Sequence, residues 1–411
     1  MTSPTTRTGL PWVPLLALAT AVFITSLTET LPAGLLPGMS ESLGVSDSAA
    51  GQTVSVYAAG TALTAIPLAK ATARMPRKAV LLWAMAIFAA ANTVTAASPV
   101  YPITLAARVV AGIAAGLAWA VLAGYARRLA SAGSEGRAIA IAMIGIPVAL
   151  SLGVPAGTFI GQFADWRVPF AAITVLTLGV IAWIAFGVPD VADESDTQAP
   201  RSVSARTAMT TPGVAAVMAV VLVFVLGHTV LYAYIAPYLA AARLGSSTDL
   251  ILLVFGAASL VAIWSTGRYI DTHLRMLTLA SSVLFIIAGA ALATAPPVSL
   301  IWLAAGVWGL GWGGVPTLLQ TAGAKAASAH SLAAADTAQA VLVTLWNAAM
   351  ALGGLLGGLV LAGIGPRAIP AAATIFVAVG LAIVAAGHEQ AFPALSSRER
   401  SASDPVTMPS S

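Results

Sequence analysis

Long apolar segments follow one another along the whole 411-residue chain. A helix that spans a bilayer needs about 20 mostly apolar residues, and these runs are too long and continuous for the strands of a membrane barrel. The sequence therefore predicts an all-α integral membrane protein with twelve transmembrane helices. They are expected at residues 12–33, 49–69, 79–98, 102–126, 138–160, 168–188, 212–239, 247–266, 275–294, 298–321, 335–362 and 368–387.

Composition supports this class and excludes others. Only 8% of the residues are charged and 59% are hydrophobic, whereas a soluble domain carries about 25% charged residues. The chain has no cysteine, which excludes disulfides and thiolate chemistry. Its net charge is only +4 and it lacks a long basic block, so nucleic acid is not expected as a partner.

A polar stretch divides the chain into two halves with six predicted spans each. We expect a cytoplasmic N-terminus at 1–11, six-helix bundles at 12–188 and 212–388, a cytoplasmic linker at 189–211 and a disordered cytoplasmic tail at 389–411. The loops "ATARMPRKAVLL" and "GRYIDTHLRMLTL" follow the second span of each half and resemble each other weakly. Such parallel repeats are typical of transporters built from two bundles.

Lysine and arginine predict the orientation. With the N-terminus inside, the inner loops and the linker contain twelve Lys and Arg residues, whereas the outer loops contain only Arg167, Arg243 and Arg367. Because cytoplasmic loops are enriched in these residues, both termini are expected in the cytoplasm.

Away from the ends of the predicted spans, three acidic, basic or histidine residues remain inside them, and such residues suggest function by default. If Glu29 lies in a partly dry cavity, it would bind and release protons near neutral pH. Alternatively, the helix ends at Pro32, and Glu29 is a solvated carboxylate at its outer end. Arg108 stays charged. It could favour the ionised form of a nearby carboxylate, bind an anionic substrate group, or only form hydrogen bonds with backbone carbonyls. His228 titrates near physiological pH, or is simply packed.

Other predicted spans offer residues for a ligand cavity. Aromatic rings with a few polar groups suit a mostly apolar organic ligand, although the tryptophans could instead form a belt at the membrane interface. The candidates for the cavity are Thr25, Tyr232, Trp308, Trp312 and Asn347.

The span at 138–160 combines glycine with proline. Its glycines recur at four- or eight-residue steps, which predicts a smooth stripe for close helix packing, and its prolines permit bending. The residues concerned are Gly145, Pro147, Gly153, Pro155, Gly157 and Gly161. Packing alone is the alternative interpretation.

With these residues assembled, the chain resembles the major facilitator superfamily over about residues 12–388, and in particular twelve-span drug:proton antiporters of the arabinose-efflux-like and chloramphenicol-efflux-like branch. The matching stretches are "TETLPAGLLPGMSESLGVS", "LAARVVAGIAAG", "LGVPAGTFIGQ", "YAYIAPYL" and "PTLLQT". The resemblance implies that Arg108 stands at the arginine linked to proton coupling, and that "LGVPAGTFIGQ" is the antiporter motif. It also implies two bundles that rock about a central cavity.

One loop departs from the family pattern, in which a Gly-x-x-x-Asp-Arg segment follows the second span. Ala69 and Ala73 occupy the glycine and aspartate places, whereas the loop in the second half keeps both residue types. The resemblance implies cytoplasmic gate residues at Arg74, Arg77, Lys78, Gly267, Arg268 and Asp271.

The sequence therefore predicts a secondary active transporter of the bacterial cytoplasmic membrane that exports small drug-like molecules in exchange for protons. Glu29, Arg108 and His228 are the predicted proton-coupling residues. The alternatives are a sugar or nucleobase exporter or importer, and a membrane sensor that transports nothing. The absence of nucleotide-binding and hydrolase motifs argues against an enzyme. We expect a monomer without cofactor or metal, whose partners are the bilayer, protons and the substrate.

Overall fold

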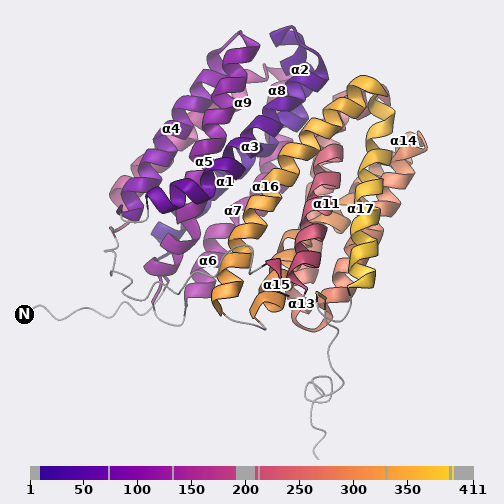
Figure 1. The fold of residues 1–411 in the computed structure, drawn as a ribbon. Coiled ribbons are helices and arrows are strands. Elements are labelled where there is room, and N and C mark those ends of the chain that lie inside the picture. The colour runs from indigo at the N-terminus through magenta and orange to yellow at the C-terminus, as the bar shows by residue number, and fades with distance from the viewer. Residues whose placement is uncertain are drawn as a thin grey trace, which may run out of the picture.

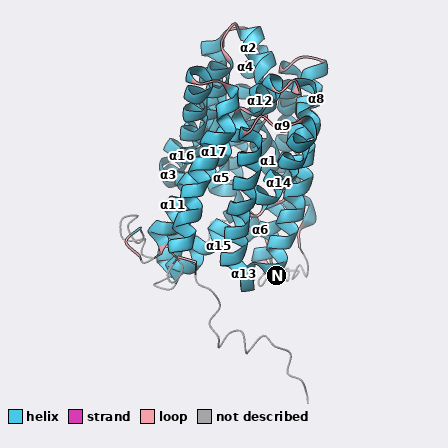
Figure 2. Ribbon diagram, turned by 90° about the vertical axis from the view of Figure 1, so that its right-hand side faces the viewer, coloured by secondary structure: helices cyan, strands magenta, loops and turns pink. Residues whose placement is uncertain are grey.

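The computed structural model describes residues 10–72, 75–131, 134–190, 209–211, 213–328, 332–387 and 391–392. Within these ranges every regular element is a helix (Figure 2). Most of the predicted N-terminus at 1–11, most of the linker at 189–211 and nearly all of the tail lie outside them, so these predicted boundaries stay predictions.

The first half of the chain forms six spans. Their helices are α1 (Trp12–Thr30) continued by α2 (Pro32–Leu43), α3 (Asp47–Ala71), α4 (Arg77–Ala97), α5 (Tyr101–Leu129), α6 (Glu135–Met143) continued by α7 (Gly145–Val148), η1 (Ala149–Gly153) and α8 (Val154–Phe163), and α9 (Arg167–Gly187).

The second half repeats this arrangement. Its helices are α11 (Val214–Ala233) continued by α12 (Ile235–Ala241), α13 (Thr248–Ala293), α14 (Val298–Gly313) continued by α15 (Val315–Ser328), α16 (Leu332–Gly363) and α17 (Ile369–Ala386), with the short helical turns η2 (Gly245–Ser247) and η3 (Pro366–Ala368).

Helix α13 contains two of the predicted spans. Its 46 residues would measure about 69 Å if straight, at about 1.5 Å per residue, more than twice the hydrocarbon thickness of about 30 Å. The backbone leaves helical geometry at His273, with φ −130° and ψ 28°. Tyr238 near the end of α12 donates a hydrogen bond to Leu292 O (2.7 Å), and α12 also contacts η2 just before α13. The chain therefore folds back at His273.

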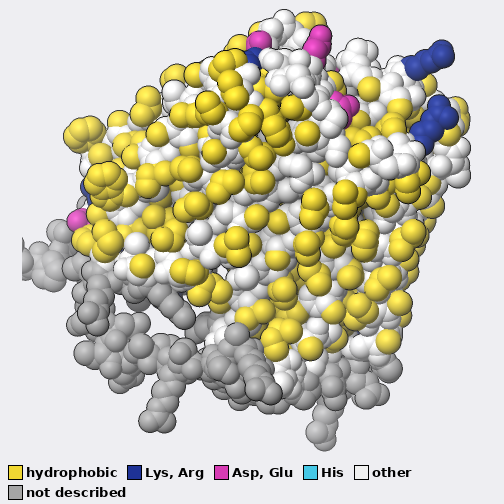
Figure 3. Space-filling view, turned by 45° about the horizontal axis from the view of Figure 1, so that its top comes forward, with side chains coloured by type: hydrophobic (Ala, Val, Ile, Leu, Met, Phe, Trp, Pro, Cys, Tyr) yellow, Lys and Arg dark blue, Asp and Glu magenta, His cyan; other side chains and the backbone are white. Residues whose placement is uncertain are grey.

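The predicted fold class is confirmed. Ten helical segments of the described ranges are long and apolar enough to cross a membrane, and one of them, Gly245–Ala293, contains the two spans of α13. The remaining span is α3, which packs between α5 and α16. Hydrophobic side chains cover most of the face seen in Figure 3, and charged side chains lie near its edges.

The spans run between two ends of the molecule. Trp12, Lys78 and Gly187 lie at the first, because Gly187 faces Val13 and Lys78 Nζ donates to Val188 O (2.8 Å). Ser42 and Arg167 lie at the second, where Arg167 Nη1 donates to Ser42 Oγ (2.6 Å). We call these the basic end and the opposite end; Lys78, Arg127, Arg137, Arg268 and Arg275 lie at the former, and Arg167, Arg243 and Arg367 at the latter.

The two halves form two six-helix bundles, seen side by side in Figure 1, where the indigo-to-magenta elements lie on the left and the later elements on the right. They meet where α3 packs on α16, and where η1 and α8 pack on α13.

The first span is longer than predicted. Residues 12–33 were expected, but the helix continues beyond Pro32 to Leu43. Proline is tolerated there because it occupies the first turn of α2 and its missing N–H costs little in that position. The helix ends at Gly44, whose φ of 64° gives the left-handed conformation common after a helix C-terminus.

Candidate functional site

Glu29 lies deep along the first span. It is 17 residues after Trp12 and 14 before Leu43, where α2 ends, so at about 1.5 Å per residue both ends are about 20–26 Å away. The interpretation as a carboxylate at the mouth of a terminating helix is therefore wrong. The side chain is half-buried, and its carboxylate makes no hydrogen bond or ion pair with any described residue.

Arg108 holds three helices together beside this carboxylate. Its side chain is fully buried. Nη2 donates to Thr28 O (2.8 Å) in α1 and Nε donates to Thr53 O (3.3 Å) in α3. The guanidinium carbon lies 4.6 Å from the ring centroid of Tyr57 and 5.6 Å from that of Phe170, a cation–π geometry. Arg108 thus bonds to backbone carbonyls and also acts electrostatically on Glu29, the residue after Thr28.

Two buried polar atoms at this pair lack partners among the described residues. They are Arg108 Nη1 and Thr28 Oγ1. Leaving such a group unsatisfied costs about 1–3 kcal/mol. The site therefore has unused hydrogen-bonding capacity, and a rearrangement of Glu29, a water molecule or a polar ligand atom could satisfy it.

His228 lies in an aromatic cluster of the second bundle. Trp308 Nε1–H donates to His228 Nδ1 (3.3 Å), and the imidazole stacks on Trp312 with a centroid distance of 3.4 Å and an angle of 3°. Because Nδ1 accepts a hydrogen bond, this geometry requires the neutral tautomer with hydrogen on Nε2. The other rings in contact with His228 are Tyr232, Phe255 and Phe285.

Trp308 and Trp312 are 0% and 5% exposed, in the interior of the bundle. An interfacial belt is therefore excluded for them. Trp312 also contacts Trp346 of α16, at a centroid distance of 5.7 Å.

Tyr232 connects the aromatic cluster with the Glu29–Arg108 pair. Its ring lies 5.3 Å from that of His228. Its buried hydroxyl reaches toward the side chain of Thr30, the residue after Glu29, without completing a hydrogen bond of normal geometry. Tyr232 of the second bundle therefore approaches the first span at Thr30, next to Glu29.

Two other predicted cavity residues use their polar groups within their own helices. Thr25 is fully buried, and its hydroxyl donates to Ala21 O (3.0 Å). Asn347 Nδ2 donates to Val343 O (2.9 Å) in α16. In this arrangement neither side chain donates a hydrogen bond across to the pair.

The glycine stripe of the fifth span faces α1 and α2. A methyl group on Gly145 would collide with backbone of Ala19 and Phe23, and one on Gly153 would lie 3.0 Å from the Phe23 ring. Gly157 faces Leu31, and Gly161 faces Leu35. The absence of side chains at these positions thus permits the fifth span to pack closely on α1 and α2.

The same span is also bent. Regular α-helix breaks at Ile144 and gives way to a π-helical turn at Ala149–Gly153, next to Pro147 and Pro155, whose missing N–H groups weaken the backbone ladder. Within this turn Ser151 Oγ donates to Gly256 O of α13 (3.0 Å). π-Helical turns occur frequently at functional sites; the sequence reading noted the prolines but missed Ser151.

The predicted gate residues at the basic end lie in different structural settings. Lys78 Nζ donates to Ala185 O and Val188 O, both at 2.8 Å, and so caps the end of α9 within its own bundle. Arg77 begins α4, whereas Gly267, Arg268 and Asp271 lie on α13 before the break at His273. Arg74 lies outside the described residues.

A closed contact between the bundles near the opposite end was not predicted. Ser48 Oγ of α3 donates to Gly358 O of α16 across the two bundles (2.8 Å). Tyr234 O–H donates to Gly354 O within the second bundle (2.7 Å). Gln52 Nε2 lies 3.4 Å from the Tyr234 hydroxyl. The paired glycines in "GGLLGG" at 353–358 were the available signal, because small residues permit close helix approach.

Two six-helix bundles with ionisable and aromatic residues at their interface define a secondary transporter. The chain belongs to the Major Facilitator Superfamily, whose family model matches residues 18–340. It is therefore a transporter and not an enzyme.

Several curated proteins are similar over most of their length. An uncharacterized MFS-type transporter of Bacillus subtilis is 32% identical, over 85% of this chain and 89% of that protein. A chloramphenicol efflux pump of Mycobacterium tuberculosis is 29% identical, over 87% and 90%. A probable sugar efflux transporter of Pasteurella multocida is 26% identical, over 89% of each.

Among solved structures, a bacterial homolog of the human lysosomal transporter Spinster, in an inward-facing and unoccupied conformation, shares the fold. Its TM-score is 0.73 at 14% identity, over 94% of this chain and 98% of that one.

Proposed function

We propose that the protein exports small, mostly apolar organic molecules from the cytoplasm in exchange for protons, with Glu29 as the proton site. The observation that carries this proposal is an unpaired, half-buried carboxylate deep in the first span, at the junction of α1 with α2 and beside the buried Arg108. Intramembrane carboxylates commonly serve proton relays in transporters, and two curated relatives are named as efflux proteins.

The pair suggests how protons and substrate would be coupled. A charged Glu29 is attracted to Arg108, whose Nη1 has no partner among the described residues, whereas protonation of Glu29 cancels that attraction. Binding of a proton to Glu29 would thus change the relative stability of two conformations. Coupling requires such a difference in how the proton interacts with each conformation. His228 is neutral and hydrogen-bonded in this arrangement, so we place the proton at Glu29 before His228.

The basic end is proposed to face the cytoplasm, following the excess of Lys and Arg there. The hydrogen bond from Ser48 to Gly358 lies near the opposite end. With that orientation, the conformation described is closed toward the outside. The bundles would then alternate by separating at this contact and closing at the basic end.

The aromatic cluster favours a drug-like substrate over a sugar. Rings of Tyr232, Trp312 and Trp346 form a connected aromatic cluster with His228 in the second bundle, whereas a sugar requires many polar groups that are free to bond. The amide of Asn347 on α16 is already bonded to its own helix. A sugar exporter is the second candidate, favoured by the Pasteurella relative.

The test measures substrate-induced proton movement in inside-out vesicles, with chloramphenicol, a set of sugars and a set of nucleosides. Glu29→Gln removes the titratable group and keeps the shape. We expect it to abolish proton movement and uphill export while retaining exchange of labelled substrate between the two sides. Glu41→Gln is the matched control, because Glu41 is exposed on α2.

Undiminished proton-coupled export by Glu29→Gln would refute the assignment of the proton site. Proton movement induced by sugars alone would favour the second candidate, a sugar exporter, over an exporter of drug-like molecules.

A further inference from the structure

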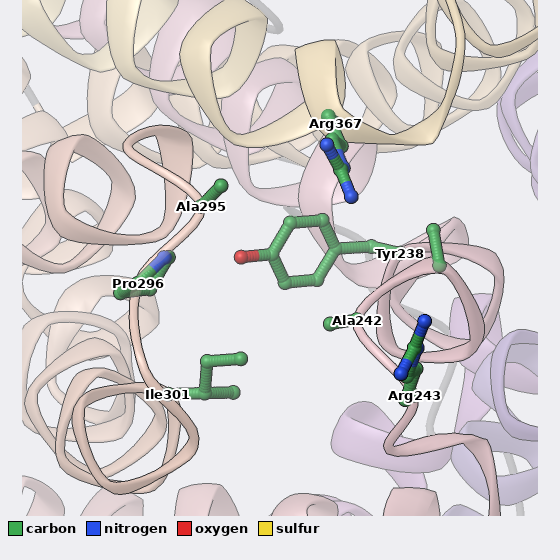
Figure 4. A pocket seen from close by; sticks show the side chains of 8 residues that line it. Tyr238, Ala242, Arg243, Ala295, Pro296, Ile301 and Arg367 are labelled. Carbon is green, nitrogen blue, oxygen red and sulfur yellow. The ribbon is translucent and has the colours of Figure 1, made fainter.

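A cavity of about 290 Å³ opens at the opposite end of the second bundle, away from the Glu29 site. Three separate segments line it: the end of α12, the connection between α13 and α14, and η3 (Figure 4). The lining residues are Tyr238, Ala241, Ala242, Arg243, Ala295, Pro296, Ile301 and Arg367.

Two arginines give this cavity its charge. Figure 4 shows Arg243 and Arg367 approaching Tyr238 from two sides and from different segments. Neither guanidinium group makes a hydrogen bond or ion pair with any described residue, and no acidic residue lines the cavity. The third arginine of this end differs, because Arg167 bonds to Ser42 and lies 3.7 Å from Asp165 Oδ1. Two guanidinium groups therefore face one cavity without an internal counter-charge.

The backbone around the cavity is unusual in the same place. Arg243 and Ala295 have φ of 62° and 52°, and they are the two non-glycine residues of the described ranges with positive φ. Residues other than glycine rarely adopt this conformation, and it persists at ligand-binding sites more often than elsewhere. Arg243, one of the two arginines that line the cavity, thus has a left-handed backbone conformation itself.

The rest of the lining is apolar. The Tyr238 hydroxyl is occupied by its hydrogen bond to Leu292 O (2.7 Å), so the cavity presents mainly its ring. Ile301 and Pro296 lie opposite the arginines in Figure 4. A suitable ligand therefore combines a compact anionic head with an apolar portion.

We propose that this cavity binds a phosphate-bearing anion at the face opposite the basic end. Guanidinium groups bind phosphate oxygens bidentately and are the preferred side chains for this purpose. Both arginine side chains are exposed at this end. With the basic end in the cytoplasm, as proposed above, they lie on the outer side, where arginine is uncommon in bacterial membrane proteins. Two sources carry this chemistry: the headgroup of an anionic phospholipid and free phosphate.

The test uses the full chain, purified in detergent and stripped of lipid. Binding is titrated with dioctanoyl phosphatidylglycerol, with the zwitterionic dioctanoyl phosphatidylcholine and with inorganic phosphate. The variants are Arg243→Gln, Arg367→Gln and the double variant, with Arg167→Gln as the control that removes a charge from the same end. Thermal unfolding in the absence of ligand verifies that each variant is folded.

We expect the wild type to bind phosphatidylglycerol, and the double variant to bind it at least about tenfold more weakly, since a charge-assisted hydrogen bond contributes that much. Arg167→Gln should bind as the wild type does. Binding of inorganic phosphate with the same dependence on both arginines supports the site with a soluble ligand. Equal binding by wild type and double variant, or no binding of either anion by the wild type, overturns the proposal.

Discussion

At the scale of single residues, Arg108 has both roles that its sequence context allowed. It is a structural arginine, because it bonds to carbonyls of α1 and α3 and stacks on Tyr57. It is also the cation that acts on Glu29. The two roles are compatible because a guanidinium has five N–H groups in a fixed fork, and Nη1 remains unbonded.

Arg108→Lys tests whether the fork matters or only the charge. A lysine ammonium keeps the charge but cannot reproduce the planar geometry that serves two carbonyls in different helices. We expect a loss of stability of about 1.5–3 kcal/mol, the contribution of one hydrogen bond to a charged group, together with reduced proton coupling. Thermal unfolding in detergent and proton movement in vesicles measure the two effects.

The control for this substitution is Arg127→Lys, which changes an exposed arginine at the end of the same helix. It should leave the unfolding temperature unchanged. If Arg108→Lys is equally neutral in both assays, the bonds to the two carbonyls contribute nothing and only the charge is needed.

At the scale of elements, the sequence predicted which segments are helices because a bilayer leaves backbone groups no other partners. It did not predict that α1 continues through Pro32, since proline both ends helices and begins them. The close packing of Gly145 and Gly153 on α1 followed from spacing alone. The glycines of "GGLLGG" indicate that α16 can be approached closely, but they do not identify Ser48 as the partner of Gly358, because that pairing depends on how two separate bundles meet.

The hydrogen bond between Ser48 and Gly358 should hold the opposite end closed. Ser48→Ala removes a bond that joins the two bundles, and one such bond contributes about 0.5–1.5 kcal/mol. We expect a shift of about two- to tenfold in population toward the conformation open at the opposite end. Distances between spin labels at Glu41→Cys on α2 and Gly363→Cys on α16 would report it, because the two sites lie at that end on different bundles.

A matched loss of a hydroxyl group comes from Thr20→Ala, whose hydroxyl bonds only to Leu16 O of its own helix (2.8 Å). This control should leave the distance distribution as in the wild type. An unchanged distribution in Ser48→Ala as well would show that helix packing, and not this bond, closes the end.

At the scale of the whole molecule, symmetry explains features that single residues leave unexplained. Lys78 caps α9 near the start of α4, and Arg275 Nη2 donates to Ala385 O near the end of α17 (3.1 Å). Both cations thus serve the carbonyl ends of the last span in their bundles, where positive charge is favoured. The two bundles therefore share this arrangement, in which a cation bonds to carbonyls of the last span. It agrees with the weak repeat between the two loop sequences.

The same end is predicted to face the cytoplasm, and the chain is well suited to test this because it contains no cysteine. Gly267→Cys at the basic end and Gly363→Cys at the opposite end introduce single thiols at glycines with open space around them. In intact cells, a thiol reagent that does not cross membranes should label Gly363→Cys and leave Gly267→Cys unlabelled until the cells are permeabilised. The reverse pattern would invert the orientation, place the closed end toward the cytoplasm and reverse the proposed direction in which Glu29 receives its proton.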